Sequence, residues 1–418
     1  MDVRRRRAVV AVAALGIAAW VAAHGRGGRQ PGAPTLTLDG PRIGAPLRFS
    51  RGEPMAGWAP RPGILVLPNR LAPWARSGLA RLGGPSRGRN PALWVPGAEQ
   101  VRWVAEWATP GLREVSVPAL KAEPGVSPVL VRLVAAALPR RRARLVAEPG
   151  PGGVWRTAWV SPRPVPTTAD RRWQRALAAA LPAGSAAVLV APSGAILAAA
   201  AGPGPAPSLA APGPVGSALV PVVLAEALGQ WWHGAALVDP SPAVGLAMAS
   251  GRWGPREALV AYRRLGLGQP PLPGVPTVPL PEAAAVSPAS LIFRGQGVWA
   301  SALAVARAWL VLGDGGRLPP LAVVAGRQAG GRVVASPAAA AAVRRLLPVV
   351  RIEARAERVW FSGPGAPAVV LVRTAPDQPA VLVAVGLNDG RALTAFLTRL
   401  AHGAGEERTV SKANPPTR

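Results

Sequence analysis

Cysteine is absent from the 418 residues, and histidine occurs only three times. The chain therefore forms no disulfides and offers no thiolate ligands, and the three scattered histidines do not have the spacing of a metal site. We expect neither a bound metal nor a cofactor. Lysine is almost as rare, occurring only at Lys121 and Lys412, so no lysine follows a glycine-rich loop and a nucleotide-binding P-loop is excluded.

Acidic residues are also scarce. The 48 Lys and Arg residues outnumber the 20 Asp and Glu residues, which gives a formal net charge of +28 at pH 7. The arginines are spread along the whole chain, and no run alternates them with aromatic residues as a nucleic-acid groove would require. We therefore expect anionic lipid or an anionic cell-wall polymer as the charged partner, and no nucleic acid.

Residues 1–29 have the pattern of a targeting segment. Four arginines at 4–7 precede the uncharged stretch 8–23. At ~1.5 Å per residue this stretch covers about 24 Å, which arginines at its ends can extend toward the ~30 Å of a bilayer core. The charge bias predicts a single-pass membrane protein with a cytoplasmic N-terminus and an extracytoplasmic main domain. The alternative is a cleaved signal peptide, for which 21–23 is a tolerable cleavage site.

The rest of the chain divides by composition. Residues 30–160 alternate short apolar runs with proline and glycine, and we expect a juxtamembrane stretch and a small mixed domain there. Residues 161–402 carry longer periodic segments, and we expect the tail 403–418 to be disordered. Helices are predicted over 168–181 (with Thr168 as N-cap), 244–265, 300–312, 337–349 and 390–402, and strands over 186–191, 195–201, 368–374 and 380–387. Early and late strands with helices between them predict an α+β domain, an antiparallel sheet with helices on both faces.

The stretch around which this domain is organised is 214–228, PVGSALVPVVLAEAL. Pro214 and Gly216 interrupt the preceding segment, and the apolar spacing that follows is that of a buried helical face. Ser217 would then lie in the first turn, near unpaired N–H groups that can stabilise an oxyanion. Val220 follows three positions later, on the same face of the helix.

The order of these segments resembles the transpeptidase domain of class B penicillin-binding proteins, the membrane-anchored D,D-transpeptidases of peptidoglycan synthesis. The resemblance is carried by RPGILVLPNRLA (61–72), VPTTADRRWQRALAAAL (165–181), AAVLVAPSGAILAAAAGP (186–203), PVGSALVP (214–221), YRRLGLGQP (262–270), LIFRGQGVWASALAVARAW (291–309), LGDGGRLPPLAVV (312–324) and VVLVRTAPDQPAVLVAVGL (369–387). It implies a β-lactamase-like fold for 161–402, preceded by a pedestal domain and an anchor.

The family's three active-site motifs are degenerate in this chain. In the first, Ser-x-x-Lys, Ser217 matches the nucleophile, but Val220 stands where the lysine base should be. In the second, Ser-x-Asn, the resemblance points to Ser241 and to Ala243 in place of the asparagine. In the third, Lys-Thr-Gly, it points to the stretch 362–366, with Ser362 before the motif, Gly363 at the lysine position and Gly365 at the glycine position.

No shift of the alignment restores these side chains. The sequence contains no lysine between Ala122 and Ser411 and no asparagine between Pro91 and Leu387. Arginine is a poor replacement, because a pKa above ~12 leaves it no neutral form that could accept a proton near pH 7. The loss of such a base typically removes several orders of magnitude of rate. We therefore expect a catalytically inactive domain.

Three hypotheses follow from these residues. The first is a pseudoenzyme that acts as a scaffold or regulator beside cell-wall synthesis, division or sporulation proteins. The second is a module that still binds peptidoglycan stem peptide or a β-lactam without reacting, and Ser217, Ser241 and Ser362 are its support. The third is a residual D,D-transpeptidase or carboxypeptidase that acts through Ser217.

Overall fold

The structure is a computed structural model, and it describes residues 36–43, 45–85, 92–94, 97–107, 112–124, 126–138, 141–149, 155–160, 163–231, 255–283, 287, 295–326, 330–352, 355–362, 365–374, 379–387 and 389–413. The chain divides into two compact units. The first contains residues 1–41, 62–117 and 142–161, and the second contains 42–61, 118–141 and 162–418. The expected continuous domain 30–160 differs from this division, because 42–61 and 118–141 belong to the second unit.

The second unit is built on a six-stranded sheet in which every neighbouring pair is antiparallel. Its strand order is β10-β9-β18-β17-β16-β15. The strands are β9 (Ala186–Val190), β10 (Ile196–Ala201), β15 (Val349–Ile352), β16 (Arg355–Phe361), β17 (Ala368–Arg373) and β18 (Pro379–Val385). The two strands nearest the C-terminus, β17 and β18, thus lie between β16 and the early hairpin β9–β10. This confirms the expected antiparallel sheet.

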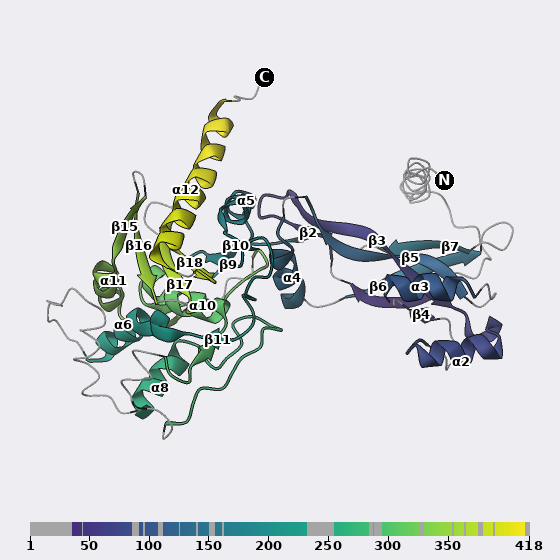
Figure 1. The fold of residues 1–418 in the computed structure, drawn as a ribbon, viewed down its shortest axis with the longest axis horizontal. Coiled ribbons are helices and arrows are strands. Elements are labelled where there is room, and N and C mark those ends of the chain that lie inside the picture. Colours follow the sequence, from purple (N-terminus) through teal and green to yellow (C-terminus); the bar gives the residue numbers. More distant parts are fainter. Residues whose placement is uncertain are drawn as a thin grey trace. The chain divides into compact units, whose positions relative to one another are not determined.

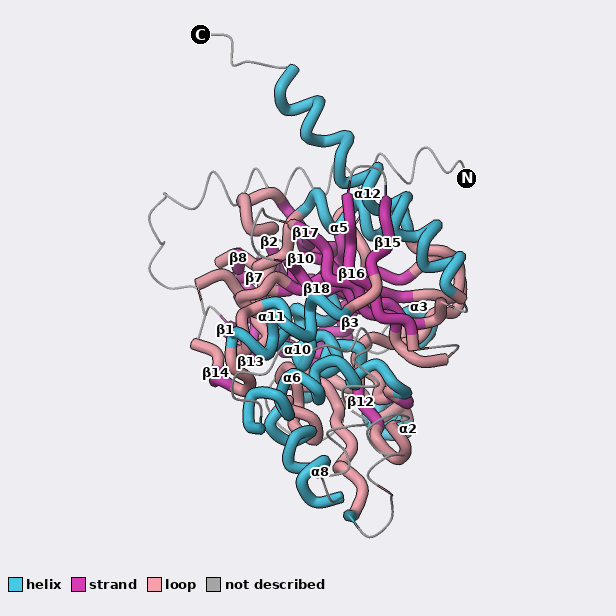
Figure 2. The backbone as a smooth tube through the Cα atoms, turned by 90° about the vertical axis from the view of Figure 1, so that its left-hand side faces the viewer, coloured by secondary structure: helices cyan, strands magenta, loops and turns pink. Residues whose placement is uncertain are grey.

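Helices cover both faces of this sheet (Figure 2). One face packs against α5 (Arg171–Ala180) and α12 (Gly390–Ala413). The other packs against a layer that includes α4 (Pro128–Ala137), α6 (Val220–Trp231), α8 (Pro255–Arg264), α10 (Ala302–Gly313) and α11 (Pro337–Leu346). Since both faces are covered, successive residues of β9 are all buried and alternate between the two cores. This explains why the central strands are continuous apolar runs.

Most of these helices begin at a hydroxyl or carboxylate cap. The side chains of Ser127, Ser301 and Ser336 accept hydrogen bonds from backbone N–H groups in the first turns of α4, α10 and α11. In α5 the cap is Asp170, which accepts from the N–H groups of Arg172 and Trp173. The expected cap at Thr168 is therefore wrong.

The C-terminal helix is longer than expected. The predicted helix over 390–402 is α12, and it continues to Ala413. The expected disordered tail is therefore wrong for 403–413. Within the predicted helix 244–265, the described part is helical over α8, and 244–254 lie outside the described residues.

The first unit combines short helices with strands of two sheets (Figure 1). One sheet has the order β1-β6-β7, with β1 (Leu36–Ile43), β6 (Arg141–Pro149) and β7 (Trp155–Val160). The second has the order β4-β3-β2-β8, with β5 also paired to β3. Its strands are β2 (Leu47–Arg48), β3 (Pro54–Val66), β4 (Ala92–Trp94), β5 (Leu112–Ala122) and β8 (Val165–Pro166). Of these, β2, β8 and the segments 54–61 and 118–122 belong to the second unit.

A small core belongs to the first unit. It joins Ile64 and Val66 of β3 to the helices α2 (Pro73–Arg81) and α3 (Ala98–Ala105), which follow the 3-10 turn η1 (Pro68–Arg70). No helix among the described residues has the length and hydropathy needed to cross a membrane. The expected targeting segment 1–29 lies outside the described residues.

Candidate functional site

Ser217 lies in a tight turn at the start of α6. The strand β11 (Gly213–Pro214) leads into the 3-10 turn η3 (Gly216–Leu219), and the α-helix itself begins at Val220. Gly216 adopts φ +54°, a left-handed conformation that costs glycine little and other residues more. The side chain of Ser217 is half-buried. Ser217 thus lies in the 3-10 turn just before the α-helix, and not in the first α-helical turn as the sequence predicted.

Val220 is part of the hydrophobic core. Its side chain is 1% exposed, and it clusters with Leu219, Val223 and Leu224, as the apolar periodicity predicts. An isopropyl group at this depth neither accepts a proton nor forms a hydrogen bond. The position one turn after the serine therefore contributes packing and no acid–base chemistry.

The turn of Ser217 meets the stretch that follows β16. A methyl group built on Gly216 would lie 2.9 Å from the Cβ of Ala366 and 3.9 Å from the Cβ of Ser362. The structure therefore brings the turn of Ser217 together with Ser362 and Ala366, which are distant from it in sequence. Gly365 in the same stretch adopts φ +78°. Of the remaining expected site residues, Ser241, Ala243 and Gly363 lie outside the described residues.

A third segment, which begins at Gly295, packs against the same turn. A methyl group built on Gly295 would clash with the carbonyl oxygen of Gly216 and would lie 2.7 Å from Val215 Cγ2. Gly295 has φ +56°, and shortly after it β12 (Trp299–Ala300) pairs with β11. The absence of a side chain at Gly295 is what allows the two backbones to approach so closely.

Two tryptophans hold the backbone of the serine turn. The indole Nε1 of Trp360 donates to the carbonyl oxygen of Ser217 at 2.9 Å, and Nε1 of Trp309 donates to that of Ala218 at 2.7 Å. Trp360 comes from β16 and Trp309 from α10, so the sheet and a core helix both fix the turn. Sequence reasoning missed both residues, because neither has a local signal that links it to position 217.

One buried hydroxyl lies beside this turn. Ser362 Oγ makes no hydrogen bond to any described residue. A buried hydroxyl without a partner typically costs about 1–3 kcal/mol. Ser362 is thus the polar group beside Gly216 that has unused hydrogen-bonding capacity in the described part of the site.

Two ionisable side chains on the described neighbouring helices, Tyr262 and Glu226, do not supply a base at Ser217. Burial raises the pKa of Tyr262 above its ordinary value, so this phenol stays protonated at working pH. Glu226 of α6 is fully buried and pairs with Arg264 at 3.1 Å. It lies six residues, or about 9 Å along the helix axis, beyond Val220.

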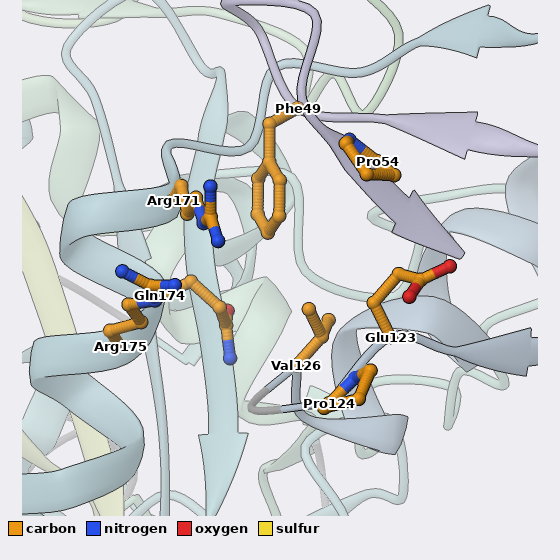
Figure 3. Close-up of a pocket in the computed structure, with 8 residues that line it drawn as sticks. All are labelled: Phe49, Pro54, Glu123, Pro124, Val126, Arg171, Gln174 and Arg175. Atoms are coloured by element: carbon orange, nitrogen blue, oxygen red, sulfur yellow. The ribbon is translucent and has the colours of Figure 1, made fainter. Parts of the chain in front are cut away.

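A separate pocket of about 230 Å³ lies at the first turns of α5 (Figure 3). Its walls come from the residues that follow β2, the segment that follows β5, and α5 itself. They are Phe49, Pro54, Glu123, Pro124, Val126, Arg171, Gln174 and Arg175. Gln174 Nε2 donates to the carbonyl of Ala199 at 3.1 Å, and its Oε1 accepts from Ala199 N at 3.0 Å, so this amide is already engaged. None of the expected site residues lines this pocket.

The sequence matches no family model and no curated protein. The structure, however, is similar to a peptidoglycan synthetase from Bifidobacterium adolescentis, with a TM-score of 0.54 and 14% identity over 93% of this chain and 98% of that one. The fold resembles that of peptidoglycan synthetases.

A second solved structure is similar over nearly the same length of the chain. It belongs to a study of the structural coordination of polymerization and crosslinking by a peptidoglycan synthase complex, and it matches with a TM-score of 0.53 and 15% identity. The match covers 95% of this chain and 96% of that one. Because both similarities run over nearly the whole length of each chain, the α+β fold expected from the sequence is confirmed at the level of architecture.

Proposed function

We propose that this chain is a non-catalytic, transpeptidase-fold protein of bacterial peptidoglycan synthesis that acts as a scaffold or regulator. The observation that carries the proposal is the burial of Val220, 1% exposed, one turn after the candidate nucleophile Ser217. Acyl transfer to a serine needs a neighbouring base that removes the hydroxyl proton. Valine cannot do this, and Trp360, Ser362 and Ala366, which lie against the same turn, are not bases either.

The fold supports the cellular process in this proposal. Both similar structures are of peptidoglycan synthetases or of a peptidoglycan synthase complex, and each match spans nearly the whole of this chain. A protein with this fold, and with no base among the described residues beside Ser217, would act by contact with wall-synthesis, division or sporulation proteins. The proposal includes a single-pass membrane location with the main domain outside, for which the arginines 4–7 and the uncharged stretch 8–23 are the support.

Intact-mass spectrometry of the purified protein after incubation with a penicillin tests the loss of catalysis. We expect no mass increase in the wild type under prolonged incubation, in a sample whose folding is verified by circular dichroism. A mass increase by one penicilloyl group that disappears in Ser217→Ala would overturn the proposal and would assign residual acylation to Ser217. An active transpeptidase treated in parallel serves as the positive control for the reagent.

Binding without reaction is the second function that a specific observation favours. The buried hydroxyl of Ser362 has no partner among the described residues and lies beside the serine turn, so it could bond to a ligand once a local shift uncovers it. Titration calorimetry with an acyl-D-Ala-D-Ala peptide separates the two functions. Saturable heat that is lost in Ser362→Ala identifies a stem-peptide-binding module, whereas the absence of heat leaves contact with protein partners as the function.

Contact with partners is tested by affinity capture from detergent-solubilised membranes. The scaffold proposal predicts that wall-synthesis or division proteins are enriched over a capture with an unrelated membrane-anchored bait. Recovery of no envelope protein above that control would contradict it.

A further inference from the structure

Five arginines lie near the β15 edge of the six-stranded sheet of the second unit. They come from the last turn of α11 and from three adjacent strands. They are Arg344 and Arg345 of α11, Arg351 of β15, Arg358 of β16 and Arg373 of β17, and together they are called the arginine face. Arg345, Arg351 and Arg373 are exposed, and Arg344 and Arg358 are half-buried.

Strand register places the three strand residues on the same side of the sheet. Arg351 pairs with Ala356, and Arg358 pairs with Leu371. Continuing the second register by two residues puts Arg373 opposite Ala356, so Arg351 and Arg373 lie in one row across three strands. Arg358 lies in the next row, with Arg373 as its diagonal neighbour at a typical spacing of roughly 7–8 Å.

This side is opposite to the one that packs on α5 and α12. Ile352 of β15 and Val359 of β16 belong to the core beneath those helices, and they alternate with the arginines along their strands. The guanidinium groups of Arg351, Arg358 and Arg373 therefore belong to the face that carries α11.

Hydrogen bonds bring the end of α11 to the same place. Arg358 Nη1 donates to the carbonyl oxygens of Arg345 at 2.9 Å and of Leu347 at 3.2 Å. Arg344 Nη1 donates to the carbonyl oxygen of Leu312 at 3.4 Å, at the end of α10. These bonds hold the side chains of Arg344 and Arg358 to backbone carbonyls through Nη1. The other N–H groups of the two guanidinium groups can still donate to a ligand.

The charges of the arginine face are not neutralised within the described residues. No ion pair joins any of the five arginines to a carboxylate there. Glu357, the acidic residue next to Arg358, alternates to the other side of β16, where its Oε2 accepts a hydrogen bond from the backbone N–H of Arg373. Burial lowers the pKa of Arg358, and the charges of Arg344, Arg373 and Arg345 lower it further, which is the electrostatic signature of crowded like charges.

We propose that the arginine face is a binding site for ligands that carry a terminal phosphate or a diphosphate group. Several arginines that share one face of three strands and a helix end are best neutralised by an anion with more than one charge in a small volume. A phosphoryl group provides nearly two charges and three acceptor oxygens, whereas a carboxylate provides one charge. Arginine also binds phosphate oxygens in a bidentate way. The inference does not depend on the proposed function, because none of these residues belongs to the turn of Ser217.

Calorimetric titration of the full chain with inorganic pyrophosphate, at constant low ionic strength and pH 7, tests the site. We expect saturable binding to the wild type and a loss of about tenfold or more in affinity in the double variant Arg351→Gln/Arg373→Gln. The matched control is Arg132→Gln/Arg256→Gln, which removes the same charge from exposed positions on α4 and α8. The control should keep the wild-type affinity within about twofold.

Two outcomes of this titration would overturn the proposal. One is equal weakening in both double variants, which would mean diffuse attraction to the net positive charge. The other is no saturable binding to the wild type up to about 10 mM pyrophosphate, a range that covers weak sites. A further variant, Arg351→Lys/Arg373→Lys, keeps the charge, and we expect it to retain only part of the affinity because lysine lacks the bidentate geometry.

Vesicle sedimentation identifies the source of the phosphate group. Vesicles of phosphatidylcholine with phosphatidic acid present a terminal phosphate, and pure phosphatidylcholine vesicles do not. Sedimentation that requires phosphatidic acid and is competed by pyrophosphate assigns a lipid source, whereas binding of pyrophosphate alone assigns a soluble one. Duplex DNA that displaces pyrophosphate through the same residues would overturn the small-ligand site in favour of a nucleic-acid surface.

Discussion

The indole Nε1 of Trp360 donates a hydrogen bond to the backbone carbonyl of Ser217 at 2.9 Å, across 143 positions of sequence. It ties the strand β16 to the turn that precedes α6. The same turn is held from the helical layer by Trp309, whose Nε1 reaches the carbonyl of Ala218 at 2.7 Å. The candidate nucleophile is therefore held by its backbone, from two sides, by side chains that perform no chemistry.

The two indole bonds should differ in their contribution to stability. Trp309→Phe should lower the free energy of unfolding by about 2–4 kcal/mol, because Trp309 is fully buried and the change leaves a cavity and an unpaired carbonyl. Trp360→Phe should cost about 1 kcal/mol, since Trp360 is partly exposed and water can replace its donor. Urea unfolding of both variants measures the difference. Equal losses would contradict the unequal burial on which the prediction rests.

Gly216→Ala tests the close approach of the serine turn to the stretch after β16. The left-handed φ of +54° disfavours alanine by about 1–2 kcal/mol, and the new methyl group would lie 2.9 Å from the Cβ of Ala366. We expect a total loss of roughly 2–3 kcal/mol in thermal or urea unfolding. The matched control is Gly315→Ala, at φ +57° with no atom within 4 Å of the new methyl group, which should show only the backbone cost. A loss no larger than that of the control would show that the two segments are not in contact.

The pair of Glu226 and Arg264 should be sensitive to loss of its exposed partner. Glu226 is fully buried, whereas the Arg264 side chain is 51% exposed. Arg264→Met removes a partner from a buried carboxylate, and we expect it to lower stability by about 2 kcal/mol, less than for a fully buried pair because water reaches the arginine. The neighbouring Arg263→Met should change stability by less than about 0.5 kcal/mol.

A double variant checks the cause of that loss. Glu226→Gln together with Arg264→Met removes the buried charge and its partner at once, so part of the stability should return relative to Arg264→Met alone. Additive losses would show that the two side chains are not coupled.

Asp314→Asn should stabilise the protein near neutral pH. Burial raises the pKa of Asp314, an effect that Arg317 partly opposes, and the carboxylate also lies at the negatively polarised end of α10. The Asp314 carboxylate therefore binds a proton more readily in the native state than in the unfolded state. Its contribution to the free energy of unfolding increases as the pH falls through the native-state pKa, and it becomes constant below the unfolded-state pKa. We expect the substitution to add about 0.5 kcal/mol at pH 7.

That gain should disappear in acid. Thermal unfolding of the variant and of the wild type is compared at pH 7 and at pH 4. The other carboxylates are the same in both proteins, so their effect on stability cancels in the difference. A variant that is less stable than the wild type at pH 7 would contradict the prediction.

Local pattern was sufficient for the elements whose signals are local. The hairpin β9–β10 and the strands β17 and β18 are short apolar runs bounded by turn residues, and they were predicted within one or two positions. The edge strand β15 and its neighbour β16 were not predicted, because arginines and a glutamate between their apolar residues give them a weak strand signal. Thr168 was mistaken for a helix cap because its real partners, the carbonyls of Ile196 and Ala322, are 28 and 154 positions away.

By itself the sequence determined that the position one turn after Ser217 is a valine and that lysine is missing from 122–411, since composition does not depend on folding. It also determined the α+β class, through the periods of its apolar residues. Tertiary structure alone decided that Ser362 and Ala366 lie beside Gly216, and that two tryptophans hold the serine turn. It also decided that the arginines of α11, β15, β16 and β17 share one face, because strand order and register bring together residues that no local pattern relates.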